Sequence, residues 1–383
     1  MENSYGQTET KNQNTISKKT ILFGYLAFIA ILGAVLYESQ WWENFSEIGL
    51  AVFLAFYFVS TALAFWLLRT NKTNSLWADA WKRLFQNKLA VFGLMVLWLT
   101  VLFVAVGPSV IYWTTGFTYD FIPPTGDLVK SFPPSFQHPM GTDEQGRDLL
   151  ARVLQGGRIS LAVGLISTVV SLLIGVSYGA IAGYSGGRID NFMMRIVDII
   201  YAIPYILIVI VLLKVLSGAN TPEFIKWLSD IFGGANNQGL SQIFLLFFAL
   251  GLVSWLTMAR VVRGQILSLK NQEFVTAARA TGVSTLGIIF RHLVPNALGP
   301  VIVYATLTIP SVMLSEAFLS FLGLGVQAPY ASWGSLAADG IKNIAVYPWQ
   351  MIFPGVTMAL TLFSLNFLGD GLRDALDPQT RKF

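Results

Sequence analysis

The stretch EFVTAARATGVSTLGIIFRHLVP, residues 273–295, decides the fold, because it is a polar helical segment between two apolar runs that can each cross a bilayer. Good helix formers fill residues 273–281, with small and apolar side chains at helical spacing on one narrow face. Gly282 predicts the end of this helix, and Ser284 predicts the N-cap of a second short helix through Leu293. The pattern is helix, glycine turn, helix and proline.

The spacing of this segment resembles the cytoplasmic "EAA" loop of the permease subunits of ABC importers. In that motif Glu-Ala-Ala is followed by a glycine and a closing proline, and here Ala277, Ala278, Gly282 and Pro295 match these positions. The resemblance implies that the segment is a coupling helix that docks into a cleft on a separate ATPase subunit. Basic residues outnumber acidic ones in this loop, which predicts a cytoplasmic position.

Three positions of the segment depart from the family motif. Thr276 stands where the motif has glutamate, His292 where isoleucine is common, and Val294 where leucine is usual. Glu273 lies one helical turn before Thr276 and is expected to replace the missing carboxylate. The predicted coupling residues are Glu273, Thr276, Ala277, Ala278, Gly282, His292 and Pro295.

The composition indicates a membrane protein. Apolar residues make up 54% of the 383 residues, charged residues only 12%, and the mean hydropathy is +0.60, so one soluble core cannot hold the apolar side chains. The absence of cysteine excludes disulfides and thiolate chemistry, and two histidines far apart make a histidine metal centre improbable. No GxxxxGK[ST] motif occurs, so we expect neither nucleotide hydrolysis nor a cofactor on this chain. The basic residues form no cluster that would bind nucleic acid.

The N-terminal fifth of the chain has three predicted parts. Residues 1–19 are polar and predict a disordered cytoplasmic tail. Two apolar runs within residues 20–68 predict a transmembrane hairpin rather than a signal peptide, because no small-residue cleavage site follows the first run. Residues 69–88 are basic and contain an amphipathic helix, which either lies along the cytoplasmic interface or packs as an elbow against the bundle.

The remaining chain predicts a six-span core, residues 89–372, with an outer loop at 114–157, the coupling loop at 264–295 and a cytoplasmic tail at 373–383. A glycine every four residues at Gly175, Gly179 and Gly183 predicts a close helix-packing face. The predicted core spans are 89–113, 159–184, 196–216 with a kink at Pro204, 242–263, 296–323 and 350–368, and the short segment SGGRIDNFMMR is expected to be a turn.

The hairpin and the core together give about eight spans in an all-α polytopic membrane protein. Both termini are then cytoplasmic, an orientation that places most of the 25 Lys and Arg residues on the inner side.

The outer loop contains HPMGTDEQGRDLLARVLQGGRISL, whose carboxylates invite an acid–base interpretation. Turn and helix-start chemistry is the favoured alternative, with Asp143 capping the helix that leads into the next span. The pattern also resembles a feature of the dipeptide, oligopeptide and nickel importer permeases. Its motif residues are Gly141, Thr142, Asp143, Gly146, Arg147 and Asp148.

Glu316 is the one acidic residue well inside an apolar span. A charge at membrane depth is costly and usually faces a bundle interior or water. Glu316 is therefore either a pathway or gating carboxylate or, as we favour, a residue near the outer mouth that pairs with a partner subunit. Residues 217–240 are an insertion relative to related permeases.

From residue 75 to the C-terminus the chain is most similar to the C-type permease subunit of bacterial oligopeptide importers. The resemblance implies a type I importer transmembrane domain in the bacterial inner membrane. It also implies a second homologous permease, two ATPase subunits that hold ATP and Mg, and a periplasmic or lipid-anchored protein that binds the peptide. The alternatives are a dipeptide or nickel importer, an ion-coupled secondary transporter that would depend on Glu316, and a membrane enzyme that would depend on the outer carboxylates.

Overall fold

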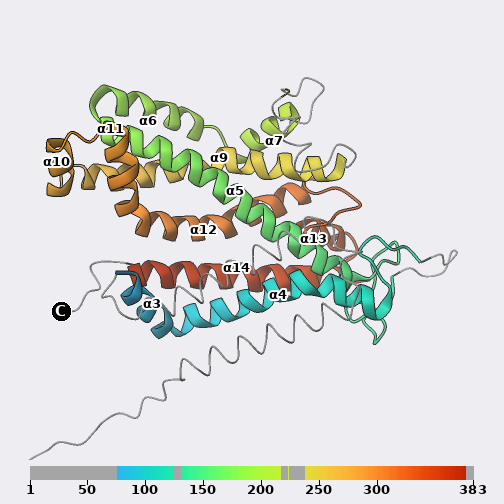
Figure 1. Ribbon diagram of the computed structural model, residues 1–383. Coiled ribbons are helices and arrows are strands. Elements are labelled where there is room, and N and C mark those ends of the chain that lie inside the picture. Colours follow the sequence, from blue (N-terminus) through green and yellow to red (C-terminus); the bar gives the residue numbers. More distant parts are fainter. Residues whose placement is uncertain (1–75, 124–130, 217–222, 224–237, 377–383) are drawn as a thin grey trace, which may run out of the picture. The chain divides into compact units, whose positions relative to one another are not determined.

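The computed structural model describes residues 76–123, 131–216, 223 and 238–376. These residues form helices joined by loops, with one isolated bridge between Thr142 and Asp148 (Figure 1). The predicted tail 1–19 and hairpin 20–68 lie outside the described residues, as do residues 69–75, most of the 217–240 insertion and residues 377–383. The described helices are α3 (Leu76–Gln86), α4 (Lys88–Thr115), α5 (Leu149–Ser185), α6 (Gly187–Tyr201), α7 (Tyr205–Leu216), α9 (Gln238–Leu269), α10 (Glu273–Ala280), α11 (Thr285–Gly287), the π-helix η3 (Ile288–Leu293), α12 (Val294–Phe321), α13 (Trp333–Ile341) and α14 (Trp349–Leu376).

Among the described residues, five helices are long and apolar enough to cross a membrane. They cover 88–115, 149–185, 242–269, 285–321 and 349–376, and the pair α6 and α7 passes the same test together. Counting that pair as one broken span gives six, which agrees with the predicted core. The spanning segments are helical because the bilayer core holds no water, so each segment must satisfy its backbone hydrogen bonds within itself.

The prediction for the α6–α7 region was partly wrong. Residues 187–201 form a helix and not a turn, and the expected span 196–216 is divided into two helices bent by 89°. The break falls at Pro204, the predicted kink. Proline has no N–H to donate and also disfavours helical geometry in the residue before it, so the helix ends there.

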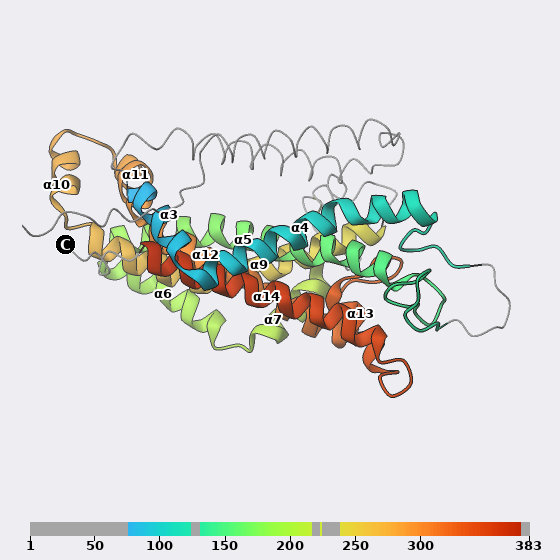
Figure 2. The ribbon, with the colours of Figure 1, turned by 90° about the horizontal axis from the view of Figure 1, so that it is seen from below.

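Helices α5 and α9 form the centre of the bundle and lie side by side in both views (Figures 1 and 2). The predicted glycine face of α5 lies in this contact. A Cβ atom on Gly175 would lie 2.6 Å from the Met258 Cβ, and one on Gly183 would lie 2.9 Å from the Arg263 carbonyl oxygen. The two backbones therefore approach more closely than any larger residue would allow, as small-residue spacing predicts.

The elbow helix α3 packs against the bundle. Ala80 and Leu84 are buried, and they cluster with Ala90 of α4 and Ala375 of α14. Residues 69–88 had two interpretations, a helix along the cytoplasmic interface or an elbow packed against the bundle. The contact with α4 and α14 favours the packed elbow.

The coupling segment leads directly into a span. Ser284 caps α11 as predicted, because its side chain accepts a hydrogen bond from the Gly287 N–H at 3.3 Å. The expected end at Leu293 is wrong, since η3 runs on into α12 and Pro295 lies in the first turn of α12. The π-helical turn ends two residues before Pro295, which cannot donate a backbone hydrogen bond.

Candidate functional site

Helix α10 projects from one end of the bundle, the end opposite α13 and the long loop before α5 (Figure 1). We call the end with α10 the inner end and the end with α13 the outer end. The predicted coupling residues lie at the inner end and the predicted outer-loop motif at the other. The two sets of residues therefore form separate sites.

One face of α10 packs against the chain itself. Val275 is fully buried and Ala278 is 7% exposed, in a cluster with Ile288 and Ile289 of η3. The small size of Ala278 is therefore required by packing within the subunit. Thr276, Ala277 and Glu273 are exposed on the other side of the helix, and Glu273 forms no ion pair with any described residue.

The turn after α10 is a Schellman motif. The Val283 N–H donates to the Ala278 carbonyl at 3.1 Å, and the Gly282 N–H donates to the Arg279 carbonyl at 3.0 Å. Gly282 has φ +79°, and a Cβ there would meet nothing within 4 Å. The glycine is thus required by backbone conformation and not by lack of space.

The second half of the segment exposes large apolar side chains. Leu286 is 62% exposed and Phe290 45%, and Phe274 of α10 is 38% exposed. Pro295 is exposed and His292 is half-buried, with its carbonyl accepting a hydrogen bond from Asn296 at 2.6 Å. Exposed aromatic and aliphatic side chains of this kind mark contact surfaces for other proteins.

Polar contacts attach the coupling segment, and Lys270 just before it, to the end of α5. The Arg279 guanidinium lies 5.3 Å from the ring centre of Tyr184, at the end of α5. The Lys270 ammonium donates to the Gly183 carbonyl at 3.0 Å. Sequence analysis identified the basic residues but not these partners, because no local pattern relates residue 184 to residue 279.

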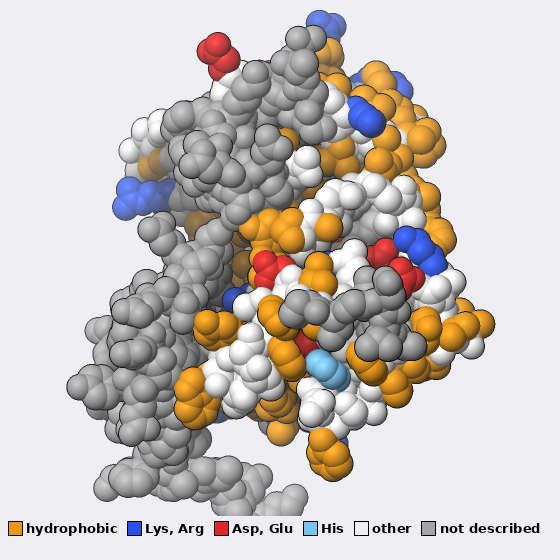
Figure 3. All heavy atoms as spheres, turned by 90° about the vertical axis from the view of Figure 1, so that its right-hand side faces the viewer, with side chains coloured by type: hydrophobic (Ala, Val, Ile, Leu, Met, Phe, Trp, Pro, Cys, Tyr) orange, Lys and Arg blue, Asp and Glu red, His pale blue; other side chains and the backbone are white. Residues whose placement is uncertain are grey.

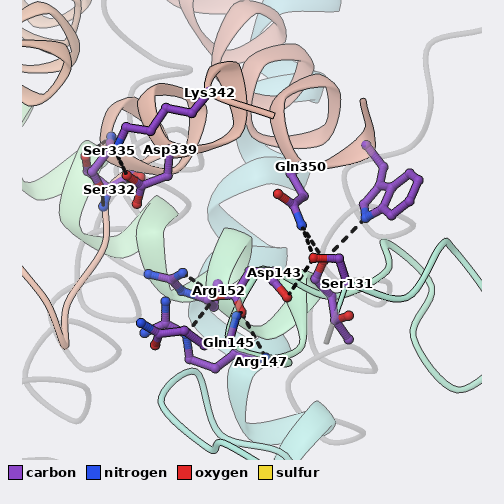
Figure 4. A network of polar contacts seen from close by, with 12 residues as sticks. Ser131, Asp143, Gln145, Arg147, Arg152, Ser332, Ser335, Asp339, Lys342 and Gln350 are labelled. Carbon is purple, nitrogen blue, oxygen red and sulfur yellow. Dashed lines mark hydrogen bonds and ion pairs between the residues drawn. The ribbon is translucent and has the colours of Figure 1, made fainter. Parts of the chain in front are cut away.

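The outer-loop motif forms a compact polar network (Figure 4). Asp143 accepts hydrogen bonds from the backbone N–H groups of Gln145 and Arg147, at 2.9 and 3.0 Å. Its other oxygen accepts from the Arg147 Nε at 2.7 Å and from the Arg152 Nη1 at 2.6 Å. Asp143 therefore holds a turn and pairs with two buried guanidinium groups.

The residue that caps α5 is Asp148, so the prediction of Asp143 as the cap is wrong. Asp148 accepts a hydrogen bond from the Ala151 N–H at 2.8 Å, and its second oxygen lies 2.8 Å from the His138 Nδ1. The correction follows from Gly146, whose φ of +80° turns the chain once more before helical geometry begins at Leu149. A cap must directly precede the first helical residue.

The motif also joins the loop to α14. The Thr142 carbonyl accepts hydrogen bonds from Gln350 at 2.9 Å and from Trp349 at 3.3 Å. Gly141 has φ +77° and lies against the Trp349 ring. Sequence analysis missed Gln350, because nothing in an apolar helix start marks it as a partner for a loop about 200 residues earlier.

The burial of these groups argues against an acid–base site. Asp143 and Asp148 are 8% and 4% exposed, and both are already paired. A catalytic carboxylate needs access to a reacting atom. Figure 3 shows the outer end, where hydrophobic side chains lie among acidic and basic ones.

Tyr119 lies in the loop after α4 and stacks on Tyr330. Burial, together with the charge of Tyr330 and Asp120, raises the pKa of Tyr119 to about 12.

Glu316 lies inside the subunit, where it is 1% exposed. One of its carboxyl oxygens accepts hydrogen bonds from the Ser320 and Ser332 hydroxyls, each at 2.6 Å. Ser332 also caps α13, so Glu316 attaches α13 to α12. This position gives Glu316 contacts within its own chain, in place of the expected contact with a partner subunit.

The comparisons with known proteins agree with this architecture. The family described as "Binding-protein-dependent transport system inner membrane component" matches residues 175–382, and the "N-terminal TM domain of oligopeptide transport permease C" matches residues 75–124. The oligopeptide transport system permease protein OppC of Haemophilus influenzae is 47% identical over 309 residues, which cover 80% of this chain and 90% of the relative.

Two relatives come from Bacillus subtilis. Its OppC is 44% identical over 313 residues, covering 82% of this chain and 93% of the relative. Its dipeptide transport system permease protein DppC is 44% identical over 310 residues, which cover 79% of this chain and 86% of the relative. The chain therefore belongs to the family of binding-protein-dependent transport system inner membrane components, as an OppC-like permease subunit that crosses the bacterial inner membrane several times.

Proposed function

We propose that this chain takes up peptides as one of two permease subunits in an ATP-driven importer. The observation that carries the proposal is the segment 273–295, which has the spacing of the family's coupling loop and forms a helix at one end of the bundle. The matched relatives are named for oligopeptide and dipeptide transport. The oligopeptide assignment is favoured because the permease C domain of that type matches residues 75–124.

The coupling surface that we propose consists of exposed side chains of α10, α11 and η3, namely Phe274, Ala277, Leu286 and Phe290. A separate ATPase subunit binds this surface. When two ATPase subunits close on ATP, the surface moves with them. Val275 and Ala278 transmit that movement to η3 and α12, because they are buried against Ile288 and Ile289. Rigid-body rocking of spans around a central path is the general physics of alternating access.

The orientation follows from the basic residues. Arg263, Lys270, Arg279 and Arg291 lie in or beside the coupling segment at the inner end, which we assign to the cytoplasm. We also propose that both chain termini are cytoplasmic, as the even number of spans predicted from the sequence implies. The loop before α5 faces the periplasmic side or the exterior, where a peptide-binding protein delivers the substrate.

The complete importer contains four classes of component in this proposal. They are this chain, a second homologous permease, two ATPase subunits with ATP and Mg, and the peptide-binding protein. Dipeptide or nickel transport is the alternative within the family. An ion-coupled secondary transporter is less well supported, since Glu316 is 1% exposed and is hydrogen-bonded by serine side chains within the subunit.

The test is co-purification of this chain with its candidate partners, followed by reconstitution into lipid vesicles. Peptide uptake should require the binding protein, both ATPase subunits and ATP on the ATPase side. Uptake by the isolated chain in response to an ion gradient would contradict the proposal. ATP-dependent uptake of nickel but not peptide would retain the importer and change its substrate.

A further inference from the structure

Hydroxyl side chains from three spans meet along one line of the bundle. On α12, Tyr304, Ser311 and Ser315 share one helical face, since they are separated by seven and four residues. On α9, Ser254 and Thr257 lie three residues apart. We call the full set the hydroxyl seam, which comprises Tyr205, Ser254, Thr257, Tyr304, Ser311 and Ser315.

Hydroxyl groups of the three helices approach one another along this seam. The Tyr205 hydroxyl of α7 lies within reach of the Ser254 and Ser315 hydroxyls, which themselves donate to the Leu250 and Ser311 carbonyls of their own helices. The Tyr304 hydroxyl of α12 lies within reach of Thr257 of α9. Ser311 is exposed and the other five residues are half-buried, so the seam is open on one side of the described chain.

The seam continues at its inner end into an exposed charged pair. Arg260 of α9 donates to Asp198 of α6 at 2.9 Å, with side-chain exposures of 37% and 56%. The same guanidinium lies 4.2 Å from the ring centre of Tyr201. Exposed charges on a spanning helix are costly against lipid and usually face water. The pair therefore marks the water-facing inner end of this side of the bundle.

A hollow adjoins the seam at Tyr304. Its volume is about 330 Å³, and it is open to one side. Val261 lies four residues after Thr257 on α9, and Leu307 lies between Tyr304 and Ser311 on α12, so the hollow follows the same two helices. Its lining residues are Val261, Pro300, Val303, Tyr304, Leu307, Arg373 and Leu376.

The exposed side chains of α4 differ from the seam. They include Phe92, Met95, Leu99 and Phe103, each more than two-fifths exposed and all apolar. Thr100, a half-buried hydroxyl residue of α4, donates to the Val96 carbonyl of its own helix. The α4 surface suits lipid, whereas the seam offers donors and acceptors.

Hydrogen bonding between helices is the simplest structural role for such hydroxyls. It accounts for Tyr205 and Tyr304, but not for the exposed Ser311 or the charged pair at the inner end. We infer that the hydroxyl seam lines the route of the peptide through this subunit and hydrogen-bonds its backbone. Every peptide presents the same N–H and C=O groups, and a hydroxyl pairs with either. The seam therefore recognises peptides by their backbone and independently of their side chains.

The inference rests on the proposed function and is tested in the complete complex with its binding protein. The chain has no cysteine, so single cysteines report without background from this subunit. The Ser311→Cys variant should react with a charged, membrane-impermeant thiol reagent at least ~10-fold faster than the Met95→Cys variant, because the reactive thiolate forms in water and not in lipid. Transported peptide should slow the Ser311→Cys reaction.

A second measurement compares uptake rates. The Tyr304→Phe variant should lower ATP-driven uptake by about 2-fold to 10-fold for peptides of unrelated sequence, the range expected for one lost hydrogen bond. Thr100→Val is the matched control on α4 and should leave uptake unchanged. Equal thiol reactivity of the Ser311→Cys and Met95→Cys variants in a complex that transports peptide would overturn the inference alone. A complex without ATP-dependent peptide uptake would overturn the proposed function and the inference with it.

Discussion

Arg263 of α9 binds Asp190 of α6 through two parallel hydrogen bonds, Nε to Oδ1 at 2.6 Å and Nη2 to Oδ2 at 2.7 Å. The Asp190 side chain is only 6% exposed, so its charge depends on this partner. The pair holds α6 to the inner end of α9, seven residues before Lys270 and ten before the coupling segment begins at Glu273.

Replacing Arg263 with methionine should destabilise the subunit, because Asp190 then remains as a buried charge without a partner. Loss of one member of a buried pair costs about 3 to 5 kcal/mol. Thermal unfolding of the purified complex measures the effect. Lys342→Ala is the control, since the Lys342–Asp339 pair is 70% and 63% exposed and should contribute little. Equal melting temperatures for the two variants would show that the Arg263 pair is not structural.

Replacing Asp143 with asparagine should destabilise the outer loop and reduce assembly. Two guanidinium groups depend on that carboxylate, and Arg152 is 5% exposed, with a buried Nε that lacks a hydrogen-bond partner among the described residues. The expected cost is about 3 kcal/mol or more. The exposed Glu144, replaced with glutamine, is the matched control. An Asp143→Asn complex that assembles normally but is inactive would instead support a chemical role for the carboxylate.

Tryptophan at Ala277 and at Ala278 should have different effects. Ala277 is exposed, so Ala277→Trp should leave the subunit folded and prevent the ATPase from binding. Ala278 packs against η3, so Ala278→Trp should disrupt the coupling segment itself through overpacking, at a cost of about 1 to 3 kcal/mol. Co-purification with the ATPase and limited proteolysis of the loop separate the two effects. Normal ATPase binding by the Ala277→Trp variant would remove Ala277 from the coupling surface.

Replacing Gly282 with alanine should strain the turn between α10 and α11 without a steric clash. The left-handed conformation costs a residue with a Cβ about 1 kcal/mol, and asparagine tolerates it better. We expect weaker coupling of ATP hydrolysis to uptake in the order Gly282→Val, Gly282→Ala, Gly282→Asn, with valine the most impaired. Gly264→Ala is the control, because that helical glycine also has open space around it but no positive φ. If all three Gly282 variants took up the same amount of peptide per ATP hydrolysed, the conformational argument would be contradicted.

The sequence alone was sufficient for the five unbroken spans of the described core, the glycine packing face of α5, and the turn at Gly282. Each of these depends on local rules. A lipid-spanning helix needs a long apolar run, close helix packing needs small residues at regular spacing, and a left-handed turn needs glycine. The resemblance to importer permeases was available for the same reason, since its motifs are short and contiguous.

Only the tertiary structure decided which partner each polar or small residue has. Helical spacing placed Ala278 on the small-residue face that was expected to dock on the ATPase, but in the structure Ala278 packs against η3 of its own chain. Asp143 and Asp148 are both capping residue types, and the extra turn at Gly146 selected Asp148. Glu316 meets Ser332, 16 residues further along the chain. Periodicity determines which side chains share a face, whereas the element that covers the face depends on how all the helices pack, and that is a property of the whole chain.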